Sequence, residues 1–511
     1  MHDSNGATTS LWQDIQPSIP ADGQQAPDMT VDVCIVGAGI SGLSVAYMLS
    51  QAGKKVVVLD DDAIGGTMTS RTTAHVFSAL DDRFYKLEHL FGEKGSQLAA
   101  DSHNRAIDKI EEIVLHEQIE CNFQRVDGYL FSKHTSDSHE LDQELDAALR
   151  AGMPDVKKVE YPPQQPQLGP ALHFPRQGQF QPLAYVAGLA KAIQAKGGLL
   201  YNRTHVTTIQ DDDSQPFVKT EHGSTITARH IVVATNSPIH SREFALKQAQ
   251  YMTYAIAMRI APNSFTPALY WDTQTPGYHY VRCADSAAGK NDLLIIGGED
   301  HKVGQDHAEN KHFDNLEKWA KQHFPNVENR VYQWSGEYAE PIDALAFIGL
   351  TPFQKSVYMV TGDSGQGMTH GTIAGLLITD LILGRNNPWA ELYDPSRRNL
   401  HPEAVLTMMK EGINANLQFA DYLRSGDIRS PDELAHGQGG IMSKGLRKIA
   451  VYKDNEGHIH QCSAICTHWK GVVRWNDAEK TWDCPLHGSR FNACGKLIQG
   501  PANSDLVPID D

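Results

Sequence analysis

Two cysteine–histidine pairs near the C-terminus have the residue types and the spacing of a metal centre. Cys466 and His468 form a C-x-H pair, fifteen residues follow, and Cys484 and His487 form a C-x-x-H pair. Thiolates suit ferric iron bound to sulfide, and two neutral imidazoles on a second iron lower the negative charge of such a cluster. Zinc also accepts two Cys and two His ligands, but zinc fingers usually pair Cys with Cys and His with His. The mixed pairs favour a [2Fe–2S] cluster over zinc.

The segment CTHWKGVVRWNDAEKTWDCPLHGSRFNACGKLIQGPA resembles Rieske [2Fe–2S] domains, and the resemblance covers about residues 431–511. It implies a small all-β domain whose two loops hold the cluster. High-potential members from respiratory bc complexes have an additional cysteine in each loop, which together form a disulfide, and Gly471 and Leu486 stand at those positions here. Ser489 is retained, but Phe491 replaces a tyrosine whose hydroxyl lies near a cluster sulfur. Because fewer donors then stabilise the reduced cluster, we predict a reduction potential below that of the bc-complex type.

The remaining cysteines and the overall charge limit the classes of protein that the chain could belong to. Seven cysteines do not form a disulfide framework, and we interpret Cys462 and Cys494 as small core residues. This usage suggests a reducing compartment, so we predict a cytoplasmic protein. A net charge of −17 without basic clusters argues against nucleic acid as a partner. No apolar stretch is long enough for a membrane span, and the N-terminus lacks the pattern of a secretory signal.

A glycine-rich turn near the N-terminus predicts a dinucleotide site. Gly37, Gly39 and Gly42 form G-x-G-x-x-G between a predicted strand, VDVCIVG, and a predicted helix, ISGLSVAYMLSQAG. Such glycines permit a tight turn, close approach of the backbone to a pyrophosphate, and close packing of helix on strand. Asp60 ends the next strand, where a carboxylate often binds a ribose hydroxyl. The motif by itself does not distinguish NAD from FAD.

Further segments provide a family resemblance. Residues 29–385 resemble FAD-dependent oxidoreductases of the D-amino-acid oxidase and glycine oxidase type, through VDVCIVGAGISGLSVAYMLSQAGKKVVVLD, IGGTMTSRTTAHV, the return strand at 230–238 and VTGDSGQGMTHGTIAG. The resemblance implies FAD, bound covalently or non-covalently, and removal of a hydride from a carbon next to an amine. The residues at the positions of cofactor contacts are Gly37, Gly39, Ile40, Ser41, Gly42, Asp60, Arg71, Thr72, Thr73, Val206, Gly362, Gly367 and Met368.

Candidates for catalysis are weaker, because each has an ordinary structural explanation. His75 could lie near the flavin, and Arg282 could hold a substrate carboxylate as an arginine does in amino-acid oxidases. Tyr254 could line the substrate side and Asp343 precedes a strand that runs close to the flavin in the family. A packed aromatic or a solvated carboxylate is the alternative in each case. Further candidates of the same kind are Phe180, Pro182, Tyr251, Tyr278, Tyr280 and Glu340.

The predicted fold class is α/β, with a Rossmann-like FAD-binding domain, a mixed or antiparallel substrate domain and a small all-β Rieske domain. We expect a mobile or loosely docked N-terminal arm at 1–28, an oxidoreductase domain at 29–395, a helical connector at 396–430 and the Rieske domain at 431–511. Within the oxidoreductase domain, we assign about 29–80, 170–245 and 335–395 to FAD binding. The substrate subdomain takes about 81–169, predicted mainly as amphipathic helices, and 246–334, predicted as antiparallel strands.

Two redox centres in one chain favour an electron relay. We expect a small substrate, an amine or amino acid, to reduce FAD, and the cluster to pass the electrons to an external acceptor, which could be a protein. A Rieske oxygenase would need a mononuclear iron site of two His and one carboxylate, and an FAD domain stands in its place. A redox carrier or sensor that turns over no small molecule remains an alternative.

Overall fold

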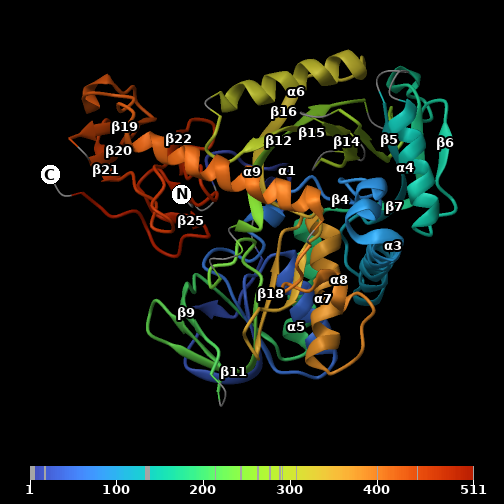
Figure 1. The fold of residues 1–511 in the computed structure, drawn as a ribbon, viewed down its shortest axis with the longest axis horizontal. Coiled ribbons are helices and arrows are strands. Elements are labelled where there is room, and N and C mark those ends of the chain that lie inside the picture. Colours follow the sequence, from blue (N-terminus) through green and yellow to red (C-terminus); the bar gives the residue numbers. More distant parts are fainter. Residues whose placement is uncertain are drawn as a thin grey trace.

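The computed structural model describes residues 6–16, 19–132, 138–212, 215–241, 244, 246–261, 264–274, 278–286, 289, 292–306, 308–399, 401–445 and 447–509. The described residues form two nine-stranded sheets and a smaller β region at the C-terminal end (Figure 1). No described helix has both the length and the apolar character needed to cross a membrane.

The first sheet begins with the predicted strand–turn–helix unit, and its central strands are parallel. β2 (Met29–Val36) lies between β3 (Val56–Leu59) and β11 (Thr225–Val233), and β11 also pairs with β18 (Val357–Thr361). β3 is buried along its whole length, as its continuous apolar sequence VVVL predicts. The remaining strands are β1 (Gly23–Gln24), β8 (Leu199–Asn202), β9 (Val206–Gln210), β10 (Phe217–Thr220) and β17 (Phe347–Leu350).

Three helices pack together beside this sheet. α2 (Ile40–Gln51) contacts both α5 (Pro182–Ala195) and α7 (Gly367–Ile382). The approach of α7 is close, because a Cβ on Gly375 would lie 3.0 Å from the Ser44 side chain. The glycine turns that precede α2 and α7 are thereby held next to each other.

The second sheet is mostly antiparallel and lies over the glycine turns that precede α2 and α7. Its order is β16 (Arg330–Pro341), β12 (Gln248–Arg259), β15 (Leu293–Lys302), β14 (His279–Ala284), β13 (Ala268–Asp272), β5 (Gln124–Phe131), β7 (Ala171–Gln179) and β4 (His75–Val76), with β6 (Lys157–Val159) beside β7. α6 (Glu309–His323) packs on β12 and β15, at the top of Figure 1. α3 (Phe84–Glu117) and α4 (Ser138–Arg150) flank the other end.

This sheet differs from the prediction. The stretch predicted as helices contains β5 and β6. The second sheet also includes β4, β7 and the second half of β16, which were predicted with the FAD-binding part. β5 pairs with β7 and β13, whose residues lie far away in the sequence. Pairing of this long range overrides the local helical pattern.

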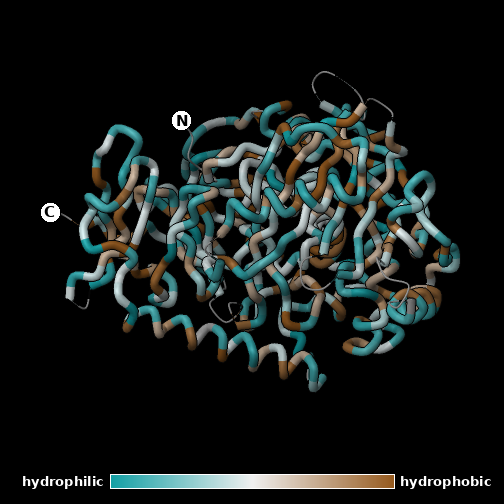
Figure 2. The backbone as a smooth tube through the Cα atoms, turned by 90° about the horizontal axis from the view of Figure 1, so that it is seen from above, coloured by the Kyte–Doolittle hydropathy of each residue, from teal (hydrophilic) through white to brown (hydrophobic). Residues whose placement is uncertain are grey.

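The C-terminal region follows a long helix. α9 (Pro402–Gln418) lies along one edge of the molecule, with hydrophobic residues among hydrophilic ones (Figure 2). A three-stranded sheet, β19 (Gln438–Lys444), β20 (Arg447–Lys453) and β21 (Ile459–Ser463), comes next. A four-stranded sheet completes the region: β22 (Arg474–Asn476), β23 (Thr481–Asp483), β24 (Arg490–Asn492) and β25 (Leu497–Gln499).

The N-terminal arm is docked, in contrast to the prediction, although residues 1–5 and 17–18 lie outside the described part. A capping box on Ser10 begins α1 (Leu11–Ile15). Leu11 and Trp12 are 0% and 1% exposed, and the Trp12 indole donates a hydrogen bond to the Thr72 carbonyl at 2.6 Å. Burial of two large apolar side chains stabilises the arm on the body, a contact that its polar composition did not reveal.

Candidate active site and cluster site

The structure brings the four predicted cluster ligands together on two facing loops. One loop runs from β21 to β22 and holds Cys466 and His468; the other joins β23 to β24 and holds Cys484 and His487. All four side chains are buried, and the two imidazole rings lie 5.2 Å apart between centroids. Backbone hydrogen bonds close both loops, from Lys470 to the Cys466 carbonyl and from Gly488 to the Cys484 carbonyl.

The chemistry of this site fits a [2Fe–2S] cluster. Both ring nitrogens of His487 are buried without a hydrogen-bond partner among the described residues, which would be costly if nothing bound there. The Cys466 and Cys484 thiols lie side by side, and the contact between them lowers the pKa of Cys466 and raises that of Cys484. Two adjacent buried thiols next to two histidines are the ligand set of such a cluster.

The positions that differ from high-potential Rieske domains lie side by side. A Cβ on Gly471 would lie 2.6 Å from Leu486 Cδ1, so the leucine fills the space that the loop disulfide takes in the high-potential domains. Phe491 is fully buried and brings no hydroxyl. None of the seven cysteines is in a disulfide; Cys462 is a buried core residue as predicted, whereas Cys494 is exposed and not in the core. Cys494 lies in the β24–β25 turn, where Asn492 accepts from its backbone, so no strand buries it.

The glycine turn has the shape of a dinucleotide cradle. Gly37 has a φ of +104°, and a Cβ there would lie 2.3 Å from the Ala234 carbonyl oxygen. Gly42 packs against the turn itself, since its Cβ would lie 1.9 Å from the Gly37 carbonyl oxygen. With Gly39 as its N-cap, α2 directs its N-terminus toward the cavity beside the turn, where backbone N–H groups favour a pyrophosphate.

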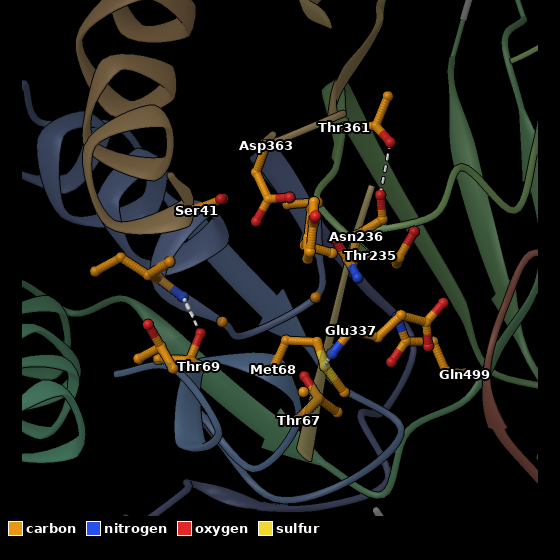
Figure 3. A pocket seen from close by; sticks show the side chains of 18 of the residues that line it. Ser41, Thr67, Met68, Thr69, Thr235, Asn236, Glu337, Thr361, Asp363 and Gln499 are labelled. Atoms are coloured by element: carbon orange, nitrogen blue, oxygen red, sulfur yellow. Dashed lines mark hydrogen bonds between the residues drawn. The ribbon is translucent and has the colours of Figure 1, made fainter. Parts of the chain in front are cut away.

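A deep cavity extends from this turn to the second sheet (Figure 3). It contains about 1860 Å³ of empty space, part of which is open to solvent. The predicted cofactor residues that line it are Gly37, Gly39, Ile40, Ser41, Asp60, Arg71, Thr72, Thr73, Val206, Gly362, Gly367 and Met368. Thr69, which sequence reasoning missed, accepts a hydrogen bond from the Ile40 backbone N–H at 3.0 Å and fixes the first turn of α2.

Asp60 lies in the wall of the cavity, but it also organises the turn. Its two oxygens accept from the backbone N–H groups of Ala38 at 2.5 Å and Asp62 at 2.9 Å. Burial, and next the charge of Asp61, raise the pKa of Asp60 to about 7. Asp61 lines the cavity as well and places a second carboxyl group beside Asp60.

Arg71 has a role that the sequence did not suggest. Its guanidinium forms a buried ion pair of 3.1 Å with Glu479 of the C-terminal region, and both side chains are at most 1% exposed. It also donates to the carbonyls of Ser335 and Thr8. Arg71 therefore joins the cavity wall to the cluster domain, and its charge is already balanced by Glu479.

Of the four catalytic candidates, the structure places only His75 in the cavity wall. Burial, together with the charge of Arg282, lowers the pKa of His75 to about 3, so its imidazole is neutral. Tyr254 points to the opposite side of β12, where its hydroxyl contacts His301 Nε2 at 2.9 Å. The sequence missed this because strand side chains alternate between two faces and Thr253 takes the cavity face.

Arg282 and Asp343 are structural residues, which corrects both predictions. The Arg282 guanidinium donates to the carbonyls of Ala74 at 2.7 Å and Phe180 at 3.2 Å, and it does not line the cavity. Asp343 forms a buried ion pair with Arg397 at 2.7 Å. Arg282 binds backbone carbonyls and Asp343 binds a distant arginine, and no local pattern could show these partners. Phe180, Pro182, Tyr251 and Glu340 also lie outside the cavity wall, whereas Tyr278 and Tyr280 are part of it.

Further residues of the cavity wall come from distant segments. The second sheet and its loops supply Thr253, Trp271, Glu337 and Tyr338, and the segment after Val76 supplies Asp81. The C-terminal region supplies Leu497, Ile498, Gln499, Gly500, Ala502 and Asn503. Glu337 and Gln499 lie next to each other in Figure 3. The two predicted redox sites are thus neighbours in space.

A second, small cavity lies where a cluster ligand meets the other domain. His487 and Pro501 line it from the cluster side, and Ser237, Pro238, Gln248 and Gln250 line it from the other side. Asn236, directly before Ser237, lines the large cavity. A single short loop therefore connects the wall of the cofactor cavity with the surroundings of His487.

Comparisons with known proteins agree with both sites. The profile of the family "FAD dependent oxidoreductase" (DAO) matches residues 32–381, and that of "Rieske [2Fe-2S] domain" matches residues 426–509. The chain is similar to the "Putative Rieske 2Fe-2S iron-sulfur protein YhfW" of Bacillus subtilis, with 29% identity over 100% of this chain and 99% of the relative. It is 25% identical to the Escherichia coli "Gamma-glutamylputrescine oxidoreductase" over 70% of this chain and 84% of that protein.

Solved structures show the same fold over the larger domain. The glycine oxidase from Geobacillus kaustophilus has a TM-score of 0.61 at 19% identity and covers 72% of this chain and 99% of its own. The L-proline dehydrogenase from P. horikoshii has a TM-score of 0.60 at 19% identity and covers 73% of this chain and 98% of its own. On the extent of the family match, the chain belongs to the DAO family of FAD-dependent oxidoreductases, binds FAD, and carries a C-terminal Rieske domain with a [2Fe–2S] cluster.

Proposed function

We propose that the protein oxidises a small amine or amino acid and passes the electrons through the Rieske cluster to an external one-electron acceptor. FAD, when bound, supplies the two-electron acceptor, and the cluster supplies one-electron transfer. The observation that carries the proposal is the shared wall of the FAD cavity, to which the Rieske domain contributes Gln499, Ala502 and Asn503 among others. Two sites this close favour direct transfer within one chain.

The position of His487 supports the same route. Its imidazole lies at the small cavity beside Ser237 and Gln250, so one cluster ligand faces the oxidoreductase domain. The Gln250 amide reaches the Ser237 hydroxyl at 3.2 Å. Gln250 also packs against Gly488, next to His487, so β12 and the cluster loop are in van der Waals contact.

Polar contacts hold the Rieske domain in this position. Besides the Arg71–Glu479 pair, Gln305 donates to the Pro485 carbonyl at 3.0 Å, and Arg474 donates to the Gly304 carbonyl at 2.9 Å. The Thr8 hydroxyl of the docked arm donates to Glu479 at 2.5 Å. A fixed distance between the two centres suits an internal relay better than a carrier that must release its cluster domain.

The oxidation itself sets a requirement on the substrate nitrogen. Loss of a hydride from the carbon leaves the nitrogen lone pair to form the second bond of a C=N group, and FAD, when bound, would accept the hydride with both electrons. The reacting nitrogen must therefore be unprotonated. Trp271, Tyr280 and Tyr338 line the cavity together with His75, whose neutral imidazole adds no positive charge.

An anaerobic experiment with the holoprotein tests the proposal. Candidate amines and amino acids are added, and flavin absorbance and cluster EPR are followed together. Bleaching of the flavin before reduction of the cluster supports the relay, and a Cys466→Ser variant should still bleach but should not reduce an external acceptor at the normal rate. Cluster reduction without any change of the flavin would contradict the relay. If no compound bleaches the flavin while a protein partner reduces or oxidises it, the protein is a redox carrier.

A further inference from the structure

The wall that the second sheet contributes to the cavity is aromatic and acidic. Tyr278 and Tyr280 lie with ring centroids 5.5 Å apart, and Trp271 lies 5.5 Å from Phe77. All four rings line the cavity, and so does Asp81. Aromatic rings and carboxylates together are the groups that bind alkylammonium ions, through cation–π attraction and charged hydrogen bonds.

Asp81 is a carboxylate of this wall, and Tyr278, which also lines the cavity, donates a hydrogen bond to it. A second carboxylate, Asp300, lies behind the wall: it does not line the cavity, and the Tyr338 hydroxyl donates to its Oδ2 at 3.1 Å. A ligand in the cavity can therefore contact Asp81 directly, whereas Tyr338 stands between the ligand and Asp300.

The positive charges near this wall are directed elsewhere. Arg71 is the one Lys or Arg among the described residues that line the cavity, and Glu479 already balances it. Arg83 lies close to Asp81 but donates to the backbone carbonyls of Asp81 and Asp272. Arg282, the residue expected to hold a substrate carboxylate, is turned away toward backbone carbonyls. The wall therefore favours a cation and offers no partner for a carboxylate.

The electrostatic state of the two acids agrees with an empty cation site. Burial raises the pKa of Asp81 to about 7, with Arg83 opposing and with Asp82 and Asp300 adding to the increase. Burial likewise raises the pKa of Asp300 to about 6, opposed by hydrogen bonds from Thr253 and Tyr338. A cation next to Asp81 would favour the ionised form of Asp81 directly and that of Asp300 at longer range.

We propose that the substrate is an aliphatic diamine or polyamine, whose second, protonated nitrogen is held by Asp81 and by the faces of Tyr278 and Tyr280. The inference rests on the proposed oxidation, because the reacting nitrogen itself has to be neutral and cannot be the group that the carboxylate binds. A hydrocarbon chain between the two nitrogens would lie against Phe77 and Trp271. An α-amino acid would place its carboxylate among acids and is disfavoured.

Matched ligands and variants of the holoprotein provide the test. The holoprotein is titrated under anaerobic conditions with 1,4-diaminobutane, n-butylamine, glycine and proline. The change in the flavin spectrum on binding gives the dissociation constant of each compound, and the rate of bleaching is measured separately. We expect 1,4-diaminobutane to bind at least about tenfold more tightly than n-butylamine, the effect of about 1.4 kcal/mol from one favourable charge contact. Asp81→Asn should remove most of this difference, through a loss of affinity for the diamine that exceeds any loss for n-butylamine. Asp300→Asn should have a smaller effect, because Tyr338 stands between Asp300 and the cavity.

Asp82→Asn is the matched control. Asp82 neighbours Asp81 but does not line the cavity, and it accepts a hydrogen bond from Ser364 at 2.8 Å. It should retain the preference for the diamine. Equal affinities for diamine and monoamine, or loss of the preference in the Asp82 variant alone, would overturn the inference. Bleaching by glycine or proline but not by diamines would also overturn it and would leave the proposed function intact. Tight binding of the diamine without bleaching by any compound would instead overturn the proposed function.

Discussion

Replacement of Glu479 by glutamine should loosen the Rieske domain from the oxidoreductase domain without removing either cofactor. Glu479 accepts hydrogen bonds from Arg71 at 3.1 Å, from the Ser335 hydroxyl at 2.5 Å and from the Thr8 hydroxyl at 2.5 Å. Glutamine has the same size, but it loses the charge and one acceptor oxygen. The buried guanidinium of Arg71 is then left without its counter-charge.

The magnitude follows from the burial of the pair. Removal of one partner from a buried ion pair costs about 3–5 kcal/mol. We expect the lower end, about 3 kcal/mol, because the carbonyls of Ser335 and Thr8 still accept from Arg71 at 2.8 and 2.7 Å. That free energy corresponds to an increase of roughly a hundredfold in the population of undocked Rieske domain.

Urea unfolding and stopped-flow spectroscopy measure the two consequences. In Glu479→Gln, cluster absorbance should be lost at a lower urea concentration than in the wild type, and reduction of the cluster after flavin bleaching should slow. Arg71→Met combined with Glu479→Leu should recover much of the stability, since a buried pair can often be replaced by apolar residues at little cost. If Glu479→Gln unfolds within about 0.5 kcal/mol of the wild type and transfers electrons at the same rate, the ion pair does not hold the domains.

Acid should have a similar effect on the same contact. Burial opposes ionisation of Glu479, but the charges of Arg71 and Arg490 and its hydrogen bonds outweigh burial and lower its pKa. The stabilisation by Glu479 is therefore present above the ordinary glutamate pKa of about 4.3 and is lost as the pH falls through the lower folded value. The Glu479→Gln variant should lack this acid-dependent part of the unfolding curve.

Three further predictions concern the cluster and the substrate wall. Cys484→Ser should abolish the Rieske EPR signal and reduce the iron content from about two atoms per chain to near zero, while FAD stays bound; retention of both irons would exclude Cys484 as a ligand. If the new hydroxyl of Phe491→Tyr reaches a cluster sulfur, the cluster potential should rise by roughly 40 mV, the equivalent of about 1 kcal/mol for one electron. An unchanged midpoint in the redox titration would show that the hydroxyl does not reach the sulfur. The KM for a diamine should fall as the pH rises through about 6 to 7, because Asp300 and Asp81 ionise there with pKa values of about 6 and about 7. Asp81→Asn should weaken this pH dependence, and it should raise the melting temperature because it removes a desolvated carboxyl. A pH-independent KM would refute this prediction.

Local sequence contained the information for both cofactor sites, because each depends on a short motif. Gly37, Gly39 and Gly42 are needed wherever a backbone must turn sharply under a helix N-terminus, and Cys466, His468, Cys484 and His487 need only two loops of fixed length. Strand β3 and helix α5 were likewise predictable, since burial on all sides and a helical period leave a direct pattern in the sequence. The family resemblance and the absence of the loop disulfide were evident from the same segments.

Only the tertiary structure decided how the charged residues are used. Arg71, Arg282 and Asp343 have the residue types of binding or catalytic groups, yet Glu479, backbone carbonyls and Arg397 occupy them. Each partner comes from a distant segment, and a charged side chain gives no local sign of which partner it will meet. Asp81 and Asp300 are the converse case. In the sequence they resemble ordinary surface acids, and only the fold brings them next to Tyr278 and Tyr338. The identity of a cofactor is set by backbone and ligand geometry that a motif encodes, whereas the environment of a charge is set by long-range packing, which no short segment encodes.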